Sequence, residues 1–151
     1  SVHPLVLNVL DPRGIGRDSR IAHPRSHGVG SWKGAFDVVE AVGLLEYLTP
    51  DDRDYTYSKV VSTRRRLAGA ITFLRNAFAC VRPGGRLVVA NMLDSHPQLA
   101  FTLDVVQWPH IVPRSIGEIV RIIEEARIDG GIEVHLPADG VYALYVITKP
   151  F

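Results

Sequence analysis

Residues 36–48 read FDVVEAVGLLEYL, and this stretch decides the fold class. Residues 36–42 are almost continuously apolar, which predicts a strand buried on both faces, as in a parallel sheet covered by helices. Gly43 then interrupts the run, and residues 44–48 can form a helical turn. A buried strand that leads into a short helix is typical of α/β proteins.

A helix followed by a second strand is predicted further along the chain. Residues 63–81 place apolar side chains at spacings of three and four, the pattern of an amphipathic helix. Ser62 or Thr63 is a plausible N-cap. Pro83, Gly84 and Gly85 are expected to end the helix and to form a tight turn. Residues 86–91 are apolar through their centre and predict the next buried strand.

The remaining segments complete an alternation of strands and helices. Residues 5–10 favour a strand, residues 13–33 an irregular connection, and residues 96–108 a weaker helix. Ser115 and Glu118 form a capping-box pattern before another helix. Residues 132–136 and 141–148 predict an antiparallel hairpin. We therefore expect one α/β domain over residues 1–151, with three layers, a mostly parallel sheet and a C-terminal antiparallel hairpin.

The composition argues against nucleic-acid-binding and membrane-spanning proteins but does not identify a function. The net charge of +1 gives no global electrostatic case for nucleic acid binding. Cys80 is the only cysteine, so no intrachain disulfide can form, which fits a reducing cytoplasm. No apolar run reaches the roughly 18 residues needed to span a membrane, and no signal-peptide pattern is present. The chain starts with Ser1, and residues 2–10 already have the composition of a buried core, so we expect a preceding region to be missing.

The order of these motifs resembles the C-terminal two thirds of the class I S-adenosylmethionine-dependent methyltransferases. Residues 36–48 look like that family's fourth strand and following helix, and residues 74–91 like its next helix and fifth strand. Residues 140–150 are similar to the last strand, and residues 8–10 to the end of the third. The resemblance implies a Rossmann-like fold that binds S-adenosylmethionine. The family's Gly-rich cofactor loop has no counterpart here, since Gly14 and Gly16 are interpreted as a surface loop.

The resemblance also implies where ligands would lie, beyond the carboxyl ends of the strands. The cofactor would be bordered by Asn8 and Val9 at the adenine and by Glu40, Ala41 and Val42 at the sulfonium and methionine part. The acceptor would contact Tyr47, Asn91, Trp108 and His110. Glu40 and Asn91 are expected at the rim of the cleft. Residues such as Tyr47 and Trp108 are more often packing residues than ligand contacts. No metal-ligand pattern and no unique catalytic residue are identified.

Two functions from different classes follow. The first is an S-adenosylmethionine-dependent methyltransferase, here as a partial domain, acting on a small-molecule acceptor. Methyl transfer depends largely on alignment of the acceptor with an already activated methyl group, so the lack of a catalytic constellation is compatible with it. The alternative is a non-catalytic methyltransferase-like interaction module, which dimerises through its incomplete sheet or needs a partner chain. A dinucleotide-binding enzyme has less support because its fingerprint is absent.

Overall fold

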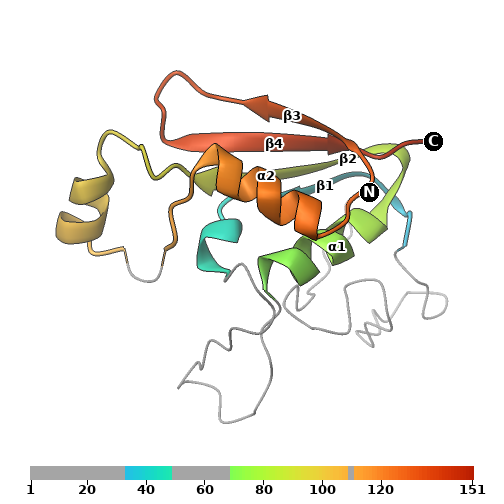
Figure 1. The fold of residues 1–151 in the computed structure, drawn as a ribbon, viewed down its shortest axis with the longest axis horizontal. Coiled ribbons are helices and arrows are strands. Elements are labelled where there is room, and N and C mark those ends of the chain that lie inside the picture. The colour runs from blue at the N-terminus through green and yellow to red at the C-terminus, as the bar shows by residue number, and fades with distance from the viewer. Residues whose placement is uncertain (1–32, 49–68, 109–110) are drawn as a thin grey trace, which may run out of the picture.

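The computed structural model describes residues 33–48, 69–108 and 111–151, which form a mixed α/β unit (Figure 1). The four strands of its sheet run in the order β1-β2-β4-β3; β1 and β2 are parallel, and the other two pairs are antiparallel. In chain order the elements are β1 (Phe36–Ala41), the 3-10 turn η1 (Leu45–Tyr47), α1 (Ala70–Cys80), β2 (Val81–Met92), the π-helical turn η2 (Phe101–Val105), α2 (Ile116–Glu125), β3 (Gly131–His135) and β4 (Tyr142–Thr148). The predicted α/β class and C-terminal hairpin are confirmed. The predicted strand at residues 5–10 lies outside the described residues.

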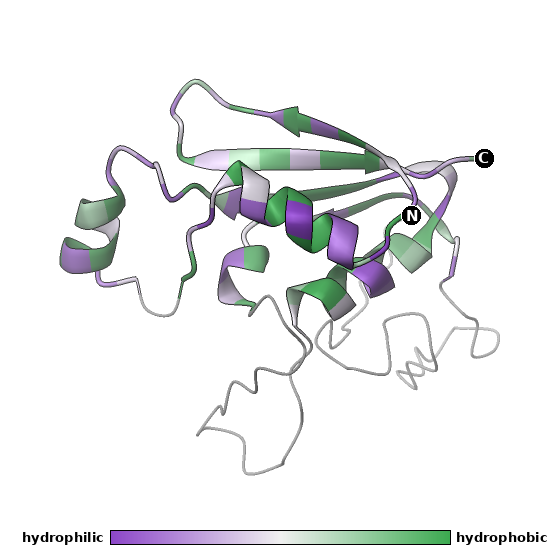
Figure 2. Ribbon diagram, in the orientation of Figure 1, coloured by the Kyte–Doolittle hydropathy of each residue, from purple (hydrophilic) through white to green (hydrophobic). Residues whose placement is uncertain are grey.

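The hydrophobic core lies between one face of the sheet and the two helices α1 and α2 (Figure 1). Along β4, Ala143, Tyr145 and Ile147 are buried and alternate with half-buried residues, so every second side chain points into this core. Figure 2 shows α2 as apolar where it meets the sheet and polar on its outer side. Ile119 and Ile123 of α2 are fully buried, and each such side chain stabilises the fold by about 1.5–3 kcal/mol. Within the described residues, both α-helices cover this same face.

The segment Pro83-Gly84-Gly85 does not end a helix, which corrects the sequence-based prediction. Helix α1 ends at Cys80, and β2 begins at once with Val81. The pairing with β1 steps from Phe36 opposite Val81 to Val38 opposite Arg86, so β2 carries extra residues in an irregular, bulge-like stretch. Gly84 has a φ of +75°, and a Cβ on Gly85 would lie 2.7 Å from the Asp37 carbonyl oxygen. The glycines permit this bulge and the close approach of β1.

The helix boundaries differ from the prediction at α1 and agree with it at α2. Helix α1 begins at Ala70 because the preceding Gly69 is extended, and the predicted caps Ser62 and Thr63 lie outside the described residues. The capping box before α2 is confirmed: the Glu118 backbone N–H donates to Ser115 Oγ over 3.2 Å, and the Ser115 N–H donates to a Glu118 carboxylate oxygen over 2.9 Å. The pKa of Glu118 is lowered by the hydrogen bonds that its carboxylate accepts from the Ser115 backbone N–H and from the Ser115 hydroxyl.

The predicted weak helix at residues 96–108 is reduced to a short helical segment that ends in η2. No residue of η2 is buried, and Gln107 just beyond it has a φ of +51°. The apolar pattern that predicted a core helix therefore faces outward. None of the helices in residues 33–48, 69–108 and 111–151 is both long enough and apolar enough to cross a bilayer.

Candidate functional site

The carboxyl ends of β1 and β2 lie at the same edge of the sheet because the two strands are parallel. Ala41, the last residue of β1, pairs with Val89, and β2 continues to Met92. The chain leaves β1 through Val42 and Gly43, whose φ of +76° turns it into η1. Glu40 and Val42 are exposed, and Ala41 is half-buried. Three of the predicted cofactor residues thus form an accessible strand end; the other two, Asn8 and Val9, lie outside the described residues.

Asn91 is not at the rim of this edge, which corrects its predicted position. Its exposed fraction is 0%. Its side-chain oxygen accepts a hydrogen bond from Arg114 over 2.9 Å, and its side-chain nitrogen donates to the Met92 and Val112 carbonyls over 2.7 and 3.3 Å. A buried amide must find such partners. Asn91 therefore joins the end of β2 to the segment before α2 through buried hydrogen bonds. Its predicted contact with an acceptor stays a prediction.

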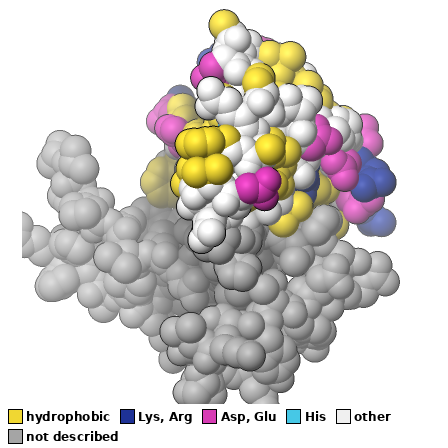
Figure 3. Space-filling model, turned by 90° about the vertical axis from the view of Figure 1, so that its left-hand side faces the viewer, with side chains coloured by type: hydrophobic (Ala, Val, Ile, Leu, Met, Phe, Trp, Pro, Cys, Tyr) yellow, Lys and Arg dark blue, Asp and Glu magenta, His cyan; other side chains and the backbone are white. Residues whose placement is uncertain are grey.

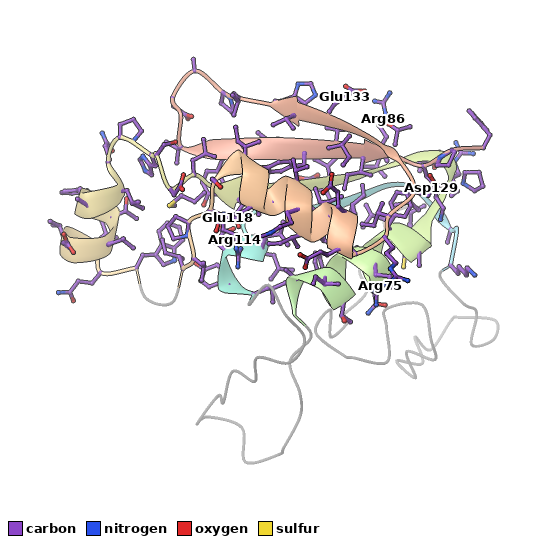
Figure 4. All side chains as sticks on the ribbon, viewed as in Figure 1. Arg75, Arg86, Arg114, Glu118, Asp129 and Glu133 are labelled. Carbon is purple, nitrogen blue, oxygen red and sulfur yellow. The ribbon has the colours of Figure 1, made fainter. Side chains whose placement is uncertain are left out.

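Arg114 donates hydrogen bonds to residues from separate elements of the site. Its guanidinium donates to the Leu45 carbonyl over 2.9 Å, to the Leu48 carbonyl, and to Asn91. The side chain is almost fully buried at the start of α2, close to Glu118 and the η1 turn (Figure 4). Burial lowers the pKa of Arg114, and the negative charges of Glu118 and Glu46 oppose that shift. The guanidinium thus joins η1, the end of β2 and the segment before α2.

Glu46 of η1 is a buried carboxylate in the same cluster. One carboxylate oxygen accepts a hydrogen bond from the Tyr142 hydroxyl over 3.0 Å, and the Val112 N–H donates to the Glu46 backbone carbonyl over 2.7 Å. Burial, with the charge and hydrogen bond of Glu46, raises the pKa of Tyr142 to about 12. The second carboxylate oxygen of Glu46 is buried and accepts no hydrogen bond from the described residues. Glu40, by contrast, is exposed.

Tyr47 and Trp108 come together at the surface of the site. The Trp108 Nε1–H donates to the Tyr47 hydroxyl, and each residue is 41% exposed. The pair joins η1 to the segment that follows η2, although the two residues are far apart in sequence. Two of the predicted acceptor contacts thus form one aromatic surface, while His110 lies outside the described residues.

Two site residues that the sequence analysis did not identify can be recognised from their sequence context. Glu46 interrupts the apolar run at residues 44–48, and Arg114 stands between apolar residues 111–113 and Ile116. A charged residue inside an apolar run is often buried with a partner. Tyr142 gave no comparable signal. Among the described parts of the chain, no cluster of His, Cys, Asp and Glu side chains could hold a metal ion.

Comparison with solved structures identifies the fold. The chain is similar to the S-adenosylmethionine-dependent methyltransferase SibL in its apo form, with 20% identity and a TM-score of 0.55 over 79% of this chain and 32% of SibL. It is similar to an O-methyltransferase family protein from Burkholderia thailandensis, with 20% identity and a TM-score of 0.52 over 97% of this chain and 35% of that one. It is also similar to PigF with SAH, with 18% identity and a TM-score of 0.53 over 78% of this chain and 31% of PigF.

No protein-family model matches the sequence, and no curated protein does. The chain spans about a third of the length of the three structures above. At identities of 20% or less these likenesses concern the fold alone. The chain has the fold of the class I S-adenosylmethionine-dependent methyltransferases, over part of the length of its structural neighbours.

Proposed function

We propose that this chain takes part in methyl transfer from S-adenosylmethionine to a small-molecule acceptor. The observation that carries the proposal is the shared edge where β1 and β2 end, with Glu40 and Val42 exposed on it and the Tyr47–Trp108 pair exposed on the adjoining turn. In doubly wound sheets, ligands bind beyond the carboxyl ends of the strands. The neighbouring structures named above share this fold, and two of them are described as methyltransferases.

The residues at this edge fit one side of a cofactor site. Gly43 turns the chain away from the strand end with a positive φ, and among the described residues a Cβ added there would come within 4 Å of Glu46 alone, at 3.8 Å. The backbone around Val42 is thereby open to a ligand. The exposed Glu40 carboxylate would attract the positive charges of the cofactor's sulfonium and amino groups. The cofactor, when bound, supplies an activated methyl group, and Asn8 and Val9 are proposed to border its adenine.

The acceptor is proposed to lie against the aromatic pair. Tyr47 and Trp108 present ring surface, and the Tyr47 hydroxyl retains its own proton for donation while it accepts from Trp108. Arg114 holds η1 through the Leu45 and Leu48 carbonyls, so the position of Tyr47 is fixed relative to the strand end. Alignment of this kind is the main contribution that a protein makes to methyl transfer. Asn91 and His110 remain proposed contacts.

The opposite side of the cofactor site is proposed to come from further polypeptide, either more of the same protein or a partner chain. β1 is the outermost strand of the described sheet on this side. The structural neighbours are about three times longer than the region they share with this chain. Cofactor affinity of these 151 residues alone is therefore expected to be weak.

Calorimetric titration with S-adenosylmethionine, paired with thermal melts, tests the proposal. Binding stabilises the folded state in proportion to RT ln(1 + [L]/Kd), so millimolar cofactor should raise the melting temperature. Val42→Arg should abolish the effect by blocking the strand end. The matched control is Val134→Arg, which alters an exposed valine on β3. Stabilisation that survives Val42→Arg would place the cofactor elsewhere, and no heat or stabilisation would show that this chain does not bind it alone.

A second function is favoured by the exposed apolar side chains around η2. Soluble monomers rarely keep many large apolar groups in contact with water unless the surface has a binding role. A methyltransferase-like module that acts by association, without catalysis, would use such a surface. Full loss of cofactor binding together with stable self-association would favour this function over methyl transfer.

A further inference from the structure

The outer edge of β3 is a feature that the proposed methyl transfer leaves unexplained. β3 stands at one end of the sheet and pairs with β4, and among the described strands none pairs with its other edge. In Figure 1 it lies along the upper border of the sheet. Its residues Glu133, Val134 and His135 are exposed. A strand edge with free backbone donors and acceptors is a template for pairing with another strand.

The hydrogen bonds of β4 show which backbone groups lie on that edge. In an antiparallel sheet, the N–H and C=O of one residue face one neighbouring strand, and those of the next residue face the other strand. The Lys149 N–H donates to the Gly85 carbonyl over 2.9 Å, and the Leu93 N–H donates to the Val141 carbonyl over 2.9 Å. The odd-numbered residues of β4 therefore face β2, and the even-numbered ones face β3.

The pairing register carries this alternation over to β3. Gly131, Glu133 and His135 lie opposite even-numbered residues of β4, so their backbone groups bond within the hairpin. The N–H and C=O groups of Ile132 and Val134 therefore point outward from the sheet. These are the groups that a further strand would bond.

The side chains of this edge form two rows with different chemistry. On the core side, Ile132 is half-buried, Val134 is 38% exposed, and Leu136 follows at 59% exposed. On the other side, Glu133 and His135 lie 3.6 Å apart and are exposed. Figure 3 views the end of the molecule where the β3–β4 turn lies, and shows apolar side chains at the tip that this turn forms at the top.

A second copy of the same edge complements both rows. In an antiparallel pair with its two-fold axis at Val134, the two Val134 residues exchange both of their outward backbone hydrogen bonds. Glu133 then lies opposite His135 of the second copy, and an imidazole N–H can donate to a carboxylate. Ile132 lies opposite Leu136, which continues the apolar row. We propose that two copies of this chain associate edge to edge through β3, antiparallel and centred on Val134.

The charges select this register over its neighbours. An axis at Glu133 would bring two carboxylates directly opposite each other, and like charges in that position are destabilising. An axis at His135 would bring two imidazoles together and leave Glu133 without a charged counterpart. The pairing does not depend on methyl transfer, since β3 lies at the end of the sheet away from β1. It joins the two four-stranded sheets into one continuous sheet.

Sedimentation equilibrium from about 5 to about 500 µM tests the proposal, because an interface of one strand pair is small and is expected to be weak. The wild-type chain should change from monomer to dimer across this range. Val134→Pro removes an N–H that faces away from β4, a position where an edge strand tolerates proline. It should raise the Kd about tenfold or more, because two hydrogen bonds per dimer are lost.

Charge substitutions test the register. Glu133→Lys and His135→Glu should each raise the Kd about three- to tenfold, because two cross-strand pairs per dimer lose their match. The two substitutions together reverse both charges and should restore the Kd to within about twofold of wild type. Both side chains are more than half exposed, so circular dichroism should show an unchanged fold.

Val38→Asp is the matched control, since it changes an exposed residue of β1 at the other end of the sheet. It should leave the Kd within about twofold of wild type, as expected of a substitution outside the interface. A chain that stays monomeric at the highest concentration would overturn the proposal. A dimer that Val38→Asp weakens and the β3 substitutions do not would overturn it too, and failure of the double charge reversal to restore the Kd would overturn the register.

Discussion

Arg114→Met removes the charged group that links three parts of the site while it keeps most of the side-chain volume. The guanidinium bonds the Leu45 and Leu48 carbonyls and Asn91. A hydrogen bond to a charged group contributes about 1.5–3 kcal/mol, and removal of one member of a buried charged cluster costs about 3–5 kcal/mol because the other members lose their partner. We expect the free energy of unfolding to fall by about 3–5 kcal/mol, which for a chain of this size lowers the melting temperature by roughly 10 °C.

Urea unfolding followed by circular dichroism measures this loss. The matched control is Arg121→Met on the exposed side of α2, where the pair with Glu125 joins two solvated side chains; its loss should be under about 0.5 kcal/mol. Adding Glu46→Gln to Arg114→Met should recover part of the stability, since it removes the buried charge left without compensation. A loss for Arg114→Met no larger than for Arg121→Met would refute the assignment of a central role to Arg114.

Three further predictions concern the fold. Gly85→Ala should lower the free energy of unfolding by about 1–3 kcal/mol, because the new Cβ would lie 2.7 Å from a backbone oxygen of β1; Gly117→Ala, where nothing lies within 4 Å, should be neutral or stabilising in the same urea assay. Ser115→Ala should cost about 1 kcal/mol by removing the N-cap of α2, and thermal melts that show no change would contradict the capping box. The pKa of Tyr142 is raised from 10.0 to about 12. The stability that the protonated Tyr142 hydroxyl contributes is therefore present below pH 10 and is lost as the pH rises toward 12. Tyr142→Phe should reduce this alkaline loss of stability in a pH series of urea unfolding curves.

Local patterns in the sequence were sufficient to predict several of the helices and strands. The capping box at Ser115 located the start of α2 to the residue. The turn chemistry between the last two strands predicted the β3–β4 hairpin. The apolar run at residues 36–42 predicted β1, but the expected burial on both faces is wrong, since Val38 is exposed and no residue of β1 is fully buried. In each case the information lies within a few neighbouring residues.

Contacts between distant residues could not be predicted in this way. Gly84 and Gly85 were predicted to end a helix. They lie instead in a bulge of β2, which forms because of the way β2 pairs with β1. Asn91 was interpreted as a polar residue at an exposed strand end, but it is buried with hydrogen bonds to Arg114 and to the Val112 carbonyl, 23 and 21 residues later in the chain. The apolar pattern of residues 96–108 resembled a core helix because periodicity cannot show whether the apolar face has a partner within the same chain.

The central claim is that the carboxyl ends of β1 and β2 form one side of an S-adenosylmethionine site. Titration of the ¹⁵N-labelled chain with S-adenosylhomocysteine, followed by NMR, tests it at the level of single residues. The account predicts progressive shifts of the amide signals of residues 40–43 and 92–94, with the signals of β3 (Gly131–His135) unchanged. Shifts centred on β3, or spread without reference to the strand ends, would contradict it.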